Sequence, residues 1–273
     1  MPKYKHPVLF YVLSAIIPWC FWILSGFLSY EENQNWREIS FLGLLGLLAP
    51  MLIAFGLIYK ESNFKRELKE RFFNWKKIKF LYIFLSLFLM LGSILFAQVI
   101  SLFFGYDTNQ FTITGHYTFS SGIFPVWFLL LLAPIIEELA WHTYGTDVLH
   151  QKFNLFYTSI FFAFYWGIWH LPLAGINHYY QSNLTQLGWV HSVNFLVSIF
   201  PFVLIMNWLY YKSHRNIFIP ITFHITAGYF NEIFATNPDT KIIQTMLLLI
   251  LGGYLIYIDK NFFFQKEVDY AKI

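Results

Sequence analysis

The chain has 273 residues, of which 57% are apolar or aromatic and only 12% are charged, whereas soluble domains carry about 25% charged residues. This composition excludes an ordinary water-soluble globule. The net charge of +3 does not indicate nucleic-acid binding, because the basic residues lie beside apolar segments, where they orient a membrane protein.

Apolar runs of membrane-spanning length recur along the whole chain. Spans of this kind need about 17–25 residues, and short charged clusters separate the runs. No polar or Pro/Gly/Ser-rich stretch is long enough to be a linker, so we expect one all-α membrane helix bundle, a single integral membrane domain over residues 1–273. The pattern predicts eight transmembrane helices, at 8–28, 40–59, 79–104, 124–142, 155–176, 189–211, 216–234 and 243–258.

The basic residues are distributed unevenly between the connections. Sixteen of the 18 Lys and Arg residues lie in the two terminal segments and in alternate connections, and only Arg37 and Lys241 lie in the others. By the positive-inside rule this places both termini in the cytoplasm, and an even number of spans agrees. We expect an integral protein of a bacterial cell membrane, surrounded by lipids; the sequence leaves its oligomeric state open.

The connection at 61–79 mixes acids and bases with phenylalanines. This pattern is typical of a helix that rests on anionic headgroups. A merely solvated connector is an equally good interpretation.

Ionisable residues inside an apolar span are costly and usually line a cavity or a site. The fourth predicted span places Glu137 and Glu138 side by side, and Glu138 lies one helical turn before His142, the spacing at which a carboxylate and an imidazole can pair. Glu137 is then left for another task, and a carboxylate in a desolvated cleft suits a general base that takes a proton from water. The competing interpretation is a buried polar cluster that only fixes how the helices pack.

Two further spans carry imidazoles. His170 lies one turn after Trp166, whose ring can pack beside it, and Pro172 is expected to kink the helix just beyond. His224 and Asn231 are seven residues apart and share one face of the seventh span. Each histidine alone is typical of a hydrogen-bonded core residue, but three spans that each bring an acid or an imidazole into the membrane interior favour a common site. Helix rise places Glu137 and His224 at similar depths and His170 nearer the outer side.

The order and spacing of these residues resemble a known family, the CPBP intramembrane proteases, which includes the type II CAAX prenyl endopeptidases and the bacterial Abi proteins linked with bacteriocin immunity. The family pattern is Glu-Glu-x-x-x-Arg, then Phe-x-x-x-His, then His-x-x-x-Asn, each on its own membrane helix. Here residues 137–142 read Glu-Glu-Leu-Ala-Trp-His, residues 166–170 read Trp-Gly-Ile-Trp-His, and residues 224–228 read His-Ile-Thr-Ala-Gly. The resemblance covers roughly residues 124–235, which we interpret as the catalytic core.

The resemblance implies an endopeptidase, a hydrolase in which Glu137 activates water with help from His170, while His224 and an asparagine-like group stabilise the oxyanion. Glu138 is implied to orient its neighbours. The chain departs from the pattern at three supporting positions, His142 for arginine, Trp166 for phenylalanine and Gly228 for asparagine. Asn231, about one turn beyond Gly228, is the candidate substitute. Imidazole, unlike guanidinium, loses its charge near neutral pH, so activity is expected to be reduced, shifted in pH or absent.

Glu137, His170 and His224 are the right residue types for zinc. No His-Glu-x-x-His helix occurs, and the implied glutamate protease does not strictly need a metal, so we expect no cofactor. The expected substrate is a peptide or a membrane protein, prenylated or not. Two other functions stay open: a non-catalytic immunity or scaffolding protein, favoured by His142 and Gly228, and a transporter, since buried carboxylates also serve proton relays.

Overall fold

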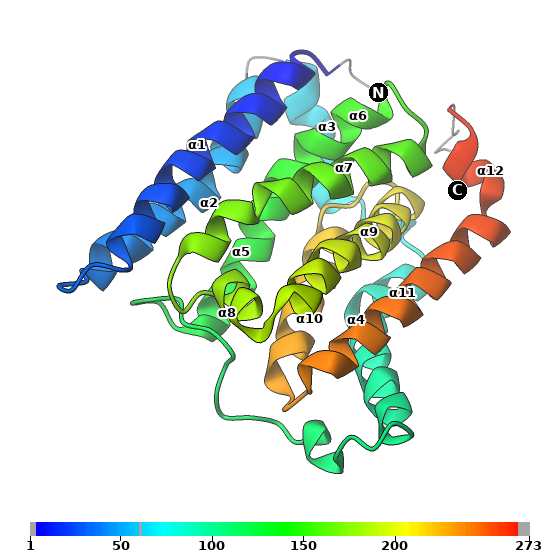
Figure 1. Cartoon of the computed structure of the whole chain (residues 1–273). Helices are drawn as coiled ribbons and strands as arrows, with labels where there is room; N and C mark the ends of the chain where they lie inside the picture. The colour runs from blue at the N-terminus through cyan, green and yellow to red at the C-terminus, as the bar shows by residue number, and fades with distance from the viewer. Residues whose placement is uncertain (1–3, 60–61, 267–273) are drawn as a thin grey trace.

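The computed structural model describes residues 4–59 and 62–266, and these ranges are almost entirely helical. Two residues form the one β-bridge in these ranges, Ile113 with Phe234. Long helices run roughly alongside one another, and the start of α1 and the helix α12 lie toward the same end of the bundle (Figure 1). The helices, including short 3₁₀ (η1, η2, η4) and π (η3) turns, are α1 Pro7–Leu28, α2 Trp36–Tyr59, α3 Ser62–Phe73, η1 Trp75–Lys77, α4 Phe80–Leu102, η2 Thr108–Phe111, α5 Val126–Ala140, η3 Trp141–Gly145, α6 Thr146–His150, α7 Leu155–Trp169, η4 Leu171–Gly175, α8 Tyr180–Leu187, α9 Trp189–Lys212, α10 Phe218–Ile233, α11 Pro238–Ile258 and α12 Lys260–Phe264.

A helix occupies each of the eight ranges predicted to span the membrane, and the all-helical membrane fold is confirmed. Among the described residues, six helices are long and apolar enough to cross a bilayer by themselves, and α7 with its continuation through α8 makes a possible seventh. The continuation bends by 84°. The helix α7 ends at Trp169 rather than kinking at Pro172, Pro172 lies in the following turn η4, and the bend lies between η4 and α8. The helix α10 is 16 residues long, short for a full crossing of about 20 residues.

Local sequence signals set several helix ends. Asn154 caps α7, because its side-chain oxygen accepts a hydrogen bond from the backbone N–H of Tyr157. Asn237 caps α11 in the same way, and Pro238 occupies the first helical position, where its missing N–H costs nothing. The helix α11 therefore begins five residues before the predicted 243, in a segment whose polar residues hid it from a hydropathy pattern.

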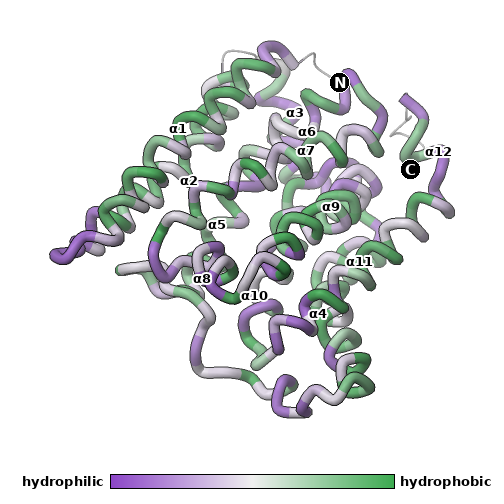
Figure 2. Tube along the Cα trace, in the orientation of Figure 1, coloured by the Kyte–Doolittle hydropathy of each residue, from purple (hydrophilic) through white to green (hydrophobic). Residues whose placement is uncertain are grey.

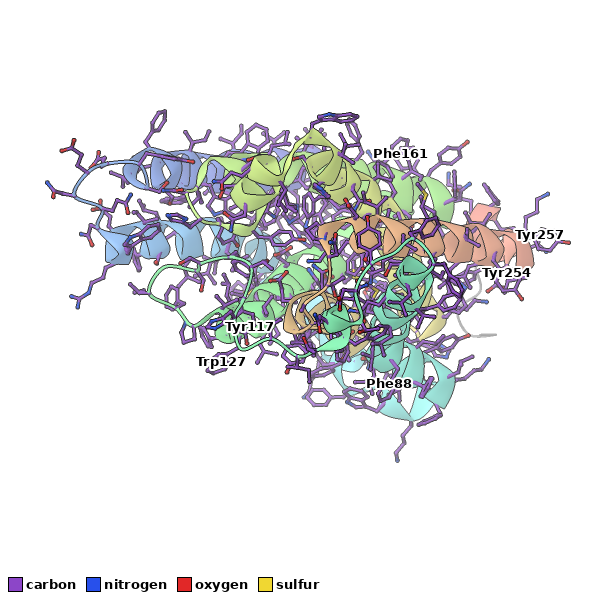
Figure 3. The ribbon with its side chains drawn as sticks, turned by 60° about the horizontal axis from the view of Figure 1, so that its bottom comes forward. Phe88, Tyr117, Trp127, Phe161, Tyr254 and Tyr257 are labelled. Atoms are coloured by element: carbon purple, nitrogen blue, oxygen red, sulfur yellow. The ribbon has the colours of Figure 1, made fainter. Side chains whose placement is uncertain are left out.

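Apolar side chains cover the outside of the bundle as well as its interior. Phe88, Trp127, Phe161 and Tyr254 all point outward, and each is well exposed (Figure 3). The middle parts of the long helices are largely hydrophobic, while most hydrophilic residues gather toward the ends and in the connections (Figure 2). An exposed apolar surface of this extent is stable only against lipid, so the chain is an integral membrane protein.

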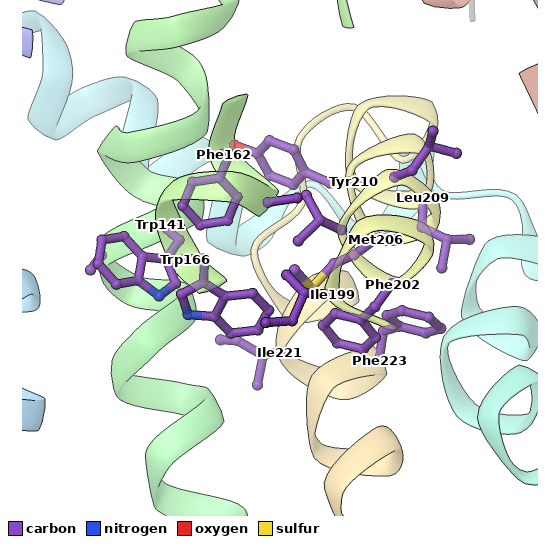
Figure 4. Packing of buried hydrophobic residues seen from close by; sticks show 14 of the residues in the cluster. Trp141, Phe162, Trp166, Ile199, Phe202, Met206, Leu209, Tyr210, Ile221 and Phe223 are labelled. Carbon is purple, nitrogen blue, oxygen red and sulfur yellow. The ribbon is translucent and has the colours of Figure 1, made fainter. Parts of the chain in front are cut away.

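Close helix contacts and stacked rings fill the interior. Trp166 stacks on Phe202, which in turn stacks on Phe223, with ring centroids 5.8 and 5.1 Å apart (Figure 4). Where α1 meets α2, the indole of Trp22 occupies the space that a Cβ at position 46 would need, so only glycine fits there. The stacked rings pack α7, α9 and α10 together beside the candidate site.

A buried ionic cluster lies at the end of the bundle near the termini. Asp147 on α6 accepts hydrogen bonds from Arg215 and from Tyr211, and it lies 3.1 Å from Arg71 of α3. Arg71 also donates to the backbone carbonyl of His142. Burial lowers the pKa of Arg215, but the negative charge of Asp147 outweighs it and raises that pKa well above its ordinary value. We call this group, with Tyr4 and Tyr210, the Asp147 cluster.

The helix expected at 61–79 is therefore present as α3, but it does more than rest on a surface. Phe64 and Arg71 are buried, and Arg71 reaches the cluster, while Lys65, Arg66 and Lys69 stay exposed. The first residue of the segment, residue 61, lies outside the described residues. The helix α3 is thus bonded to the rest of the bundle through Arg71, while its other basic side chains, Lys65, Arg66 and Lys69, stay exposed.

Replacing Asp147 by asparagine is expected to destabilise the protein by about 3–5 kcal/mol, because the buried guanidinium of Arg71 loses its ion pair with Asp147 while Arg215 keeps its pair with Glu67 alone. The matched control is Asp259→Asn, which weakens the partly exposed pair of Asp259 with Lys212 and is expected to cost less than about 1 kcal/mol. Thermal unfolding of both variants in detergent measures the difference. Equal effects would contradict a special role for the cluster.

Candidate active site

Two carboxylates lie at the C-terminal end of α5, just before the backbone widens into the π-helical turn η3. Both are buried: Glu138 completely, and Glu137 to all but 8% of its surface. Single π turns within longer helices often occur at functional sites. Because successive side chains on a helix point about 100° apart, the two carboxylates serve different neighbours.

Glu138 bonds two imidazoles from two helices. One carboxylate oxygen lies 2.7 Å from Nδ1 of His224 on α10, and the other pairs with Nδ1 of His142 one turn along. Nε2 of His142 lies 2.9 Å from the side-chain oxygen of Asn207, whose amide donates to the hydroxyl of Ser159. The predicted pairing of Glu138 with His142 is confirmed, and Glu138 orients His224 as well.

Glu137 has a different partner. Its Oε2 accepts a hydrogen bond from the indole Nε1 of Trp166 on α7, at 3.1 Å. The same indole ring packs against two imidazoles, His170 and His224, with ring centroids 5.1 and 5.2 Å away. The position at which the family pattern has phenylalanine therefore carries a hydrogen-bond donor here, and Trp166 connects Glu137, His170 and His224 in space.

His170 directly follows the last residue of α7. Its Nδ1 lies 2.6 Å from the backbone carbonyl oxygen of Trp166. An imidazole that donates from Nδ1 in this way presents Nε2 as an acceptor. Its ring also packs edge-on against Trp169 and Phe195, so its orientation is fixed. His170 does not lie apart from the other two groups, because the indole of Trp166 contacts His170 and His224 and bonds Glu137.

A cavity of about 760 Å³ connects these side chains. Glu137, His170, His224, Gly228 and Asn231 all line it, so the structure brings together the residues that the three motifs supply. Glu138 and His142 do not line it; they lie behind the wall and hold His224. The cavity walls are mainly apolar, which suits a peptide segment with hydrophobic side chains.

Gly228 leaves room at the position of the missing asparagine. A Cβ placed there would meet only Leu130, at an ordinary 3.5 Å. Asn231 lies about one turn farther along α10, and its amide donates to the hydroxyl of Tyr180 over 3.3 Å. Asn231 therefore reaches the cavity, at a level different from that of the family asparagine.

Sequence reasoning missed several residues that line the cavity. Tyr179 enters it from the bend between η4 and α8, Tyr180 and Gln181 enter it from the first turn of α8, and His191 enters it from the first turn of α9. A loop segment, 118–122, also borders it. None of these residues belongs to a spaced motif, so only the bend after Pro172 hinted that the chain turns back toward the site there.

Glu137, His170 and His224, the three side chains considered for zinc, do not come together as a ligand set. Within residues 4–59 and 62–266, no group of three or more His, Cys, Asp or Glu side chains is arranged to hold a metal ion. Nδ1 of His224 is directed at Glu138 and Nδ1 of His170 at a backbone carbonyl, which leaves Nε2 of each ring for another partner.

Replacing Trp166 by phenylalanine is expected to lower kcat by up to roughly tenfold, because Glu137 loses a hydrogen bond worth about 0.5–1.5 kcal/mol. The matched control is Trp208→Phe, which deletes the indole hydrogen bond to Asp259, 2.8 Å long, outside the cavity. Steady-state cleavage, normalised to folded protein, measures both. A loss of kcat in both variants would point to a general loss of packing instead.

Two comparisons with known proteins bear on this site. A family model described as type II CAAX prenyl endopeptidase Rce1-like matches residues 119–230, which contain all three motifs. Over 267 residues the chain is 35% identical to CAAX prenyl protease 2 of Methanococcus maripaludis, covering 97% of this chain and 98% of that relative. The chain belongs to the Rce1-like family of type II CAAX prenyl endopeptidases. The resemblance drawn from the three motifs is confirmed, and the protein is a membrane protease by family.

Proposed function

We propose that the protein hydrolyses a peptide bond inside the membrane with a water molecule activated by Glu137. Glu137 takes a proton from the water as its oxygen attacks the carbonyl carbon, and Nε2 of His170 helps to hold the water. The carbonyl oxygen gains negative charge beside His224. The tetrahedral intermediate then breaks its C–N bond, and the proton passes to the leaving nitrogen, which yields a carboxylic acid and an amine.

One observation carries this proposal: a single cavity presents Glu137, His170 and His224, while Glu138 is fully engaged behind them. The carboxylate of Glu138 stabilises positive charge on the His224 ring and orients it through Nδ1. The other ring nitrogen can then donate to the oxyanion. This division of roles between adjacent carboxylates supports Glu137 as the base and Glu138 as a positioning residue.

The substrate we propose is a membrane-held peptide. The relative from Methanococcus maripaludis is named a CAAX prenyl protease, so prenylated C-terminal peptides belong in the first panel. The experiment compares matched prenylated and unprenylated peptides, cleaved by purified protein in lipid, with His170→Ala as the inactive reference. Cleavage that His170→Ala leaves unchanged would refute the assigned roles.

We propose further that this water activation needs no metal ion. Cleavage is then expected to continue at the same rate after exhaustive chelation. Recovery of a lost activity by added zinc, and not by magnesium, would contradict this expectation. The measurement uses the most rapidly cleaved peptide of the panel.

We also propose that the chain crosses the membrane eight times, with α7 and α10 included, and that both termini are cytoplasmic. The support is the distribution of Lys and Arg residues, together with the position of the start of α1 and of α12 at one end of the bundle (Figure 1). If α10 crosses, its 16 residues must be matched by thinning of the bilayer or by neighbouring protein.

A second candidate is a membrane immunity or scaffolding protein that keeps the fold without catalysis. The absence of an amide at Gly228 favours it, since the oxyanion loses one donor there. Protection of cells against a bacteriocin that survives loss of both Glu137 and His170 would support this candidate. Loss of protection in either single variant would argue for proteolysis.

A further inference from the structure

A basic segment connects two membrane-spanning helices at the end of the bundle where α1 begins. The helices α2 and α4 are both long and apolar enough to cross a bilayer, and α3 and η1 join the end of the first to the start of the second. The ring of Phe64 in α3 packs against that of Tyr4, with centroids 4.6 Å apart, so α3 lies against the bundle near the start of α1 (Figure 1). A segment packed in this way between two consecutive spans lies at the boundary between lipid and water.

The helix α3 has two different faces. Phe64 and Arg71 are seven residues apart, so they share one face, and both are buried against the bundle. Lys65, Arg66 and Lys69 lie on the opposite face and are exposed. The helix is therefore amphipathic, with its bases directed away from the bundle, as in helices that lie in a membrane interface.

The exposed charge of the segment is almost entirely positive. Between residues 64 and 79, Glu70 is the one exposed acid, while six basic side chains are exposed. Exposed aromatic rings accompany them at Phe73, Trp75 and Phe80. Bases mixed with aromatic rings beside a membrane span are typical of a site for anionic lipid headgroups. The basic face, as we call it, consists of Lys65, Arg66, Lys69, Lys76, Lys77 and Lys79.

The buried face of α3 is bonded to the turn that supports the candidate active site. Arg71 donates to the backbone carbonyl of His142, and also to that of Thr143 over 3.5 Å. The ring of His142 pairs with Glu138, and Glu138 holds Nδ1 of His224 at 2.7 Å. A continuous chain of contacts therefore joins α3 to an imidazole that lines the cavity.

We propose that anionic lipid headgroups bind the basic face, and that this binding holds α3 in the position that orients His224 for catalysis. The surrounding membrane is the partner that fits, because the segment lies between two spans and its charge is complementary to lipid phosphate. Lys65 and Lys69 lie one turn apart, a like-charge spacing that destabilises a helix until an anion lies beside it. The effect on catalysis rests on the proposed function, whereas the binding of lipid does not.

Thermal unfolding tests the binding without relying on catalysis. The natural chain is reconstituted in vesicles of phosphatidylcholine, with and without replacement of part of this lipid by phosphatidylglycerol. A ligand that binds only the folded state raises Tm, and we expect phosphatidylglycerol to raise it by about 2–4 °C. The rise should be less than half as large in Lys65→Gln/Arg66→Gln/Lys69→Gln, which we call the α3 variant. An equal rise in both proteins would overturn the inference.

The matched control removes three charges elsewhere. Lys152→Gln/Lys260→Gln/Lys266→Gln changes exposed lysines outside the basic face and is expected to keep the full rise in Tm. If this control lost the rise as the α3 variant does, net charge alone would explain it and the site would be refuted. Glycerol phosphate, the soluble part of the same headgroup, should leave Tm unchanged in phosphatidylcholine vesicles. A rise as large as that from phosphatidylglycerol would identify free phosphate, not the membrane, as the partner.

The cleavage rate tests the link between lipid and the active site. We compare kcat, because an anionic surface also changes the local concentration of a charged peptide. Phosphatidylglycerol is expected to raise kcat severalfold in the natural chain and in the control, but not in the α3 variant. An unchanged kcat with a raised Tm would overturn the link. Absence of cleavage in every lipid would refute the proposed function, while Tm would still decide whether the basic face binds lipid.

Discussion

Replacing Glu137 by glutamine is expected to lower the cleavage rate by roughly 10²–10⁴-fold, the usual contribution of a general base. Glutamine keeps the size of the side chain and an oxygen that can accept the Trp166 hydrogen bond, but it cannot take a proton from water. The fold is therefore expected to survive while catalysis fails. Single-turnover cleavage in lipid measures the rate, because it separates chemistry from product release.

The matched control is Glu38→Gln, the same change at an exposed carboxylate in the first turn of α2. It is expected to leave the rate unchanged. Glu138→Gln is a third and different case: it disturbs two imidazoles at once, so it should lower both stability and rate. If Glu137→Gln kept full activity while Glu138→Gln lost it, the roles of the two carboxylates would have to be exchanged.

The sequence predicted the helices well because lipid demands long apolar runs, and hydropathy alone reports them. It also predicted the convergence of Glu137, His170 and His224, since ionisable side chains inside such runs must share a polar interior. The pairing of Glu138 with His142 followed from helical spacing alone. These inferences depend on local pattern, which a sequence displays directly.

Long-range contacts could not be predicted in the same way. The Asp147 cluster joins Arg71, Asp147 and Arg215, which are far apart along the chain and lie in segments read as loops or surface. The hydrogen bond from Trp166 to Glu137 depends on the packing angle of α7 against α5, which no spacing encodes.

Replacing Gly228 by asparagine is expected to raise the cleavage rate, in contrast to most active-site substitutions. The change restores the amide of the family pattern. One well-placed oxyanion donor contributes about 10²–10³ in kcat, and the gain can approach this range if the space is otherwise empty. The structure leaves room, because a Cβ at this position would meet only Leu130 at van der Waals distance. Asparagine also has a higher helix propensity than glycine, so the substitution should not destabilise α10 through its backbone.

The control for this gain is Gly253→Asn, the same change at an exposed position of α11 whose Cβ would meet nothing, and it should leave the rate unaltered. Substitution of Asn231 tests whether its amide replaces the family asparagine that is missing at position 228. If Asn231 already donates to the oxyanion, Asn231→Ala should lower the rate of the natural chain but have little effect once asparagine is present at 228. If Gly228→Asn does not raise the rate and Asn231→Ala does not lower it, neither amide donates to the oxyanion. His224 is then the side chain that stabilises the oxyanion in the natural enzyme.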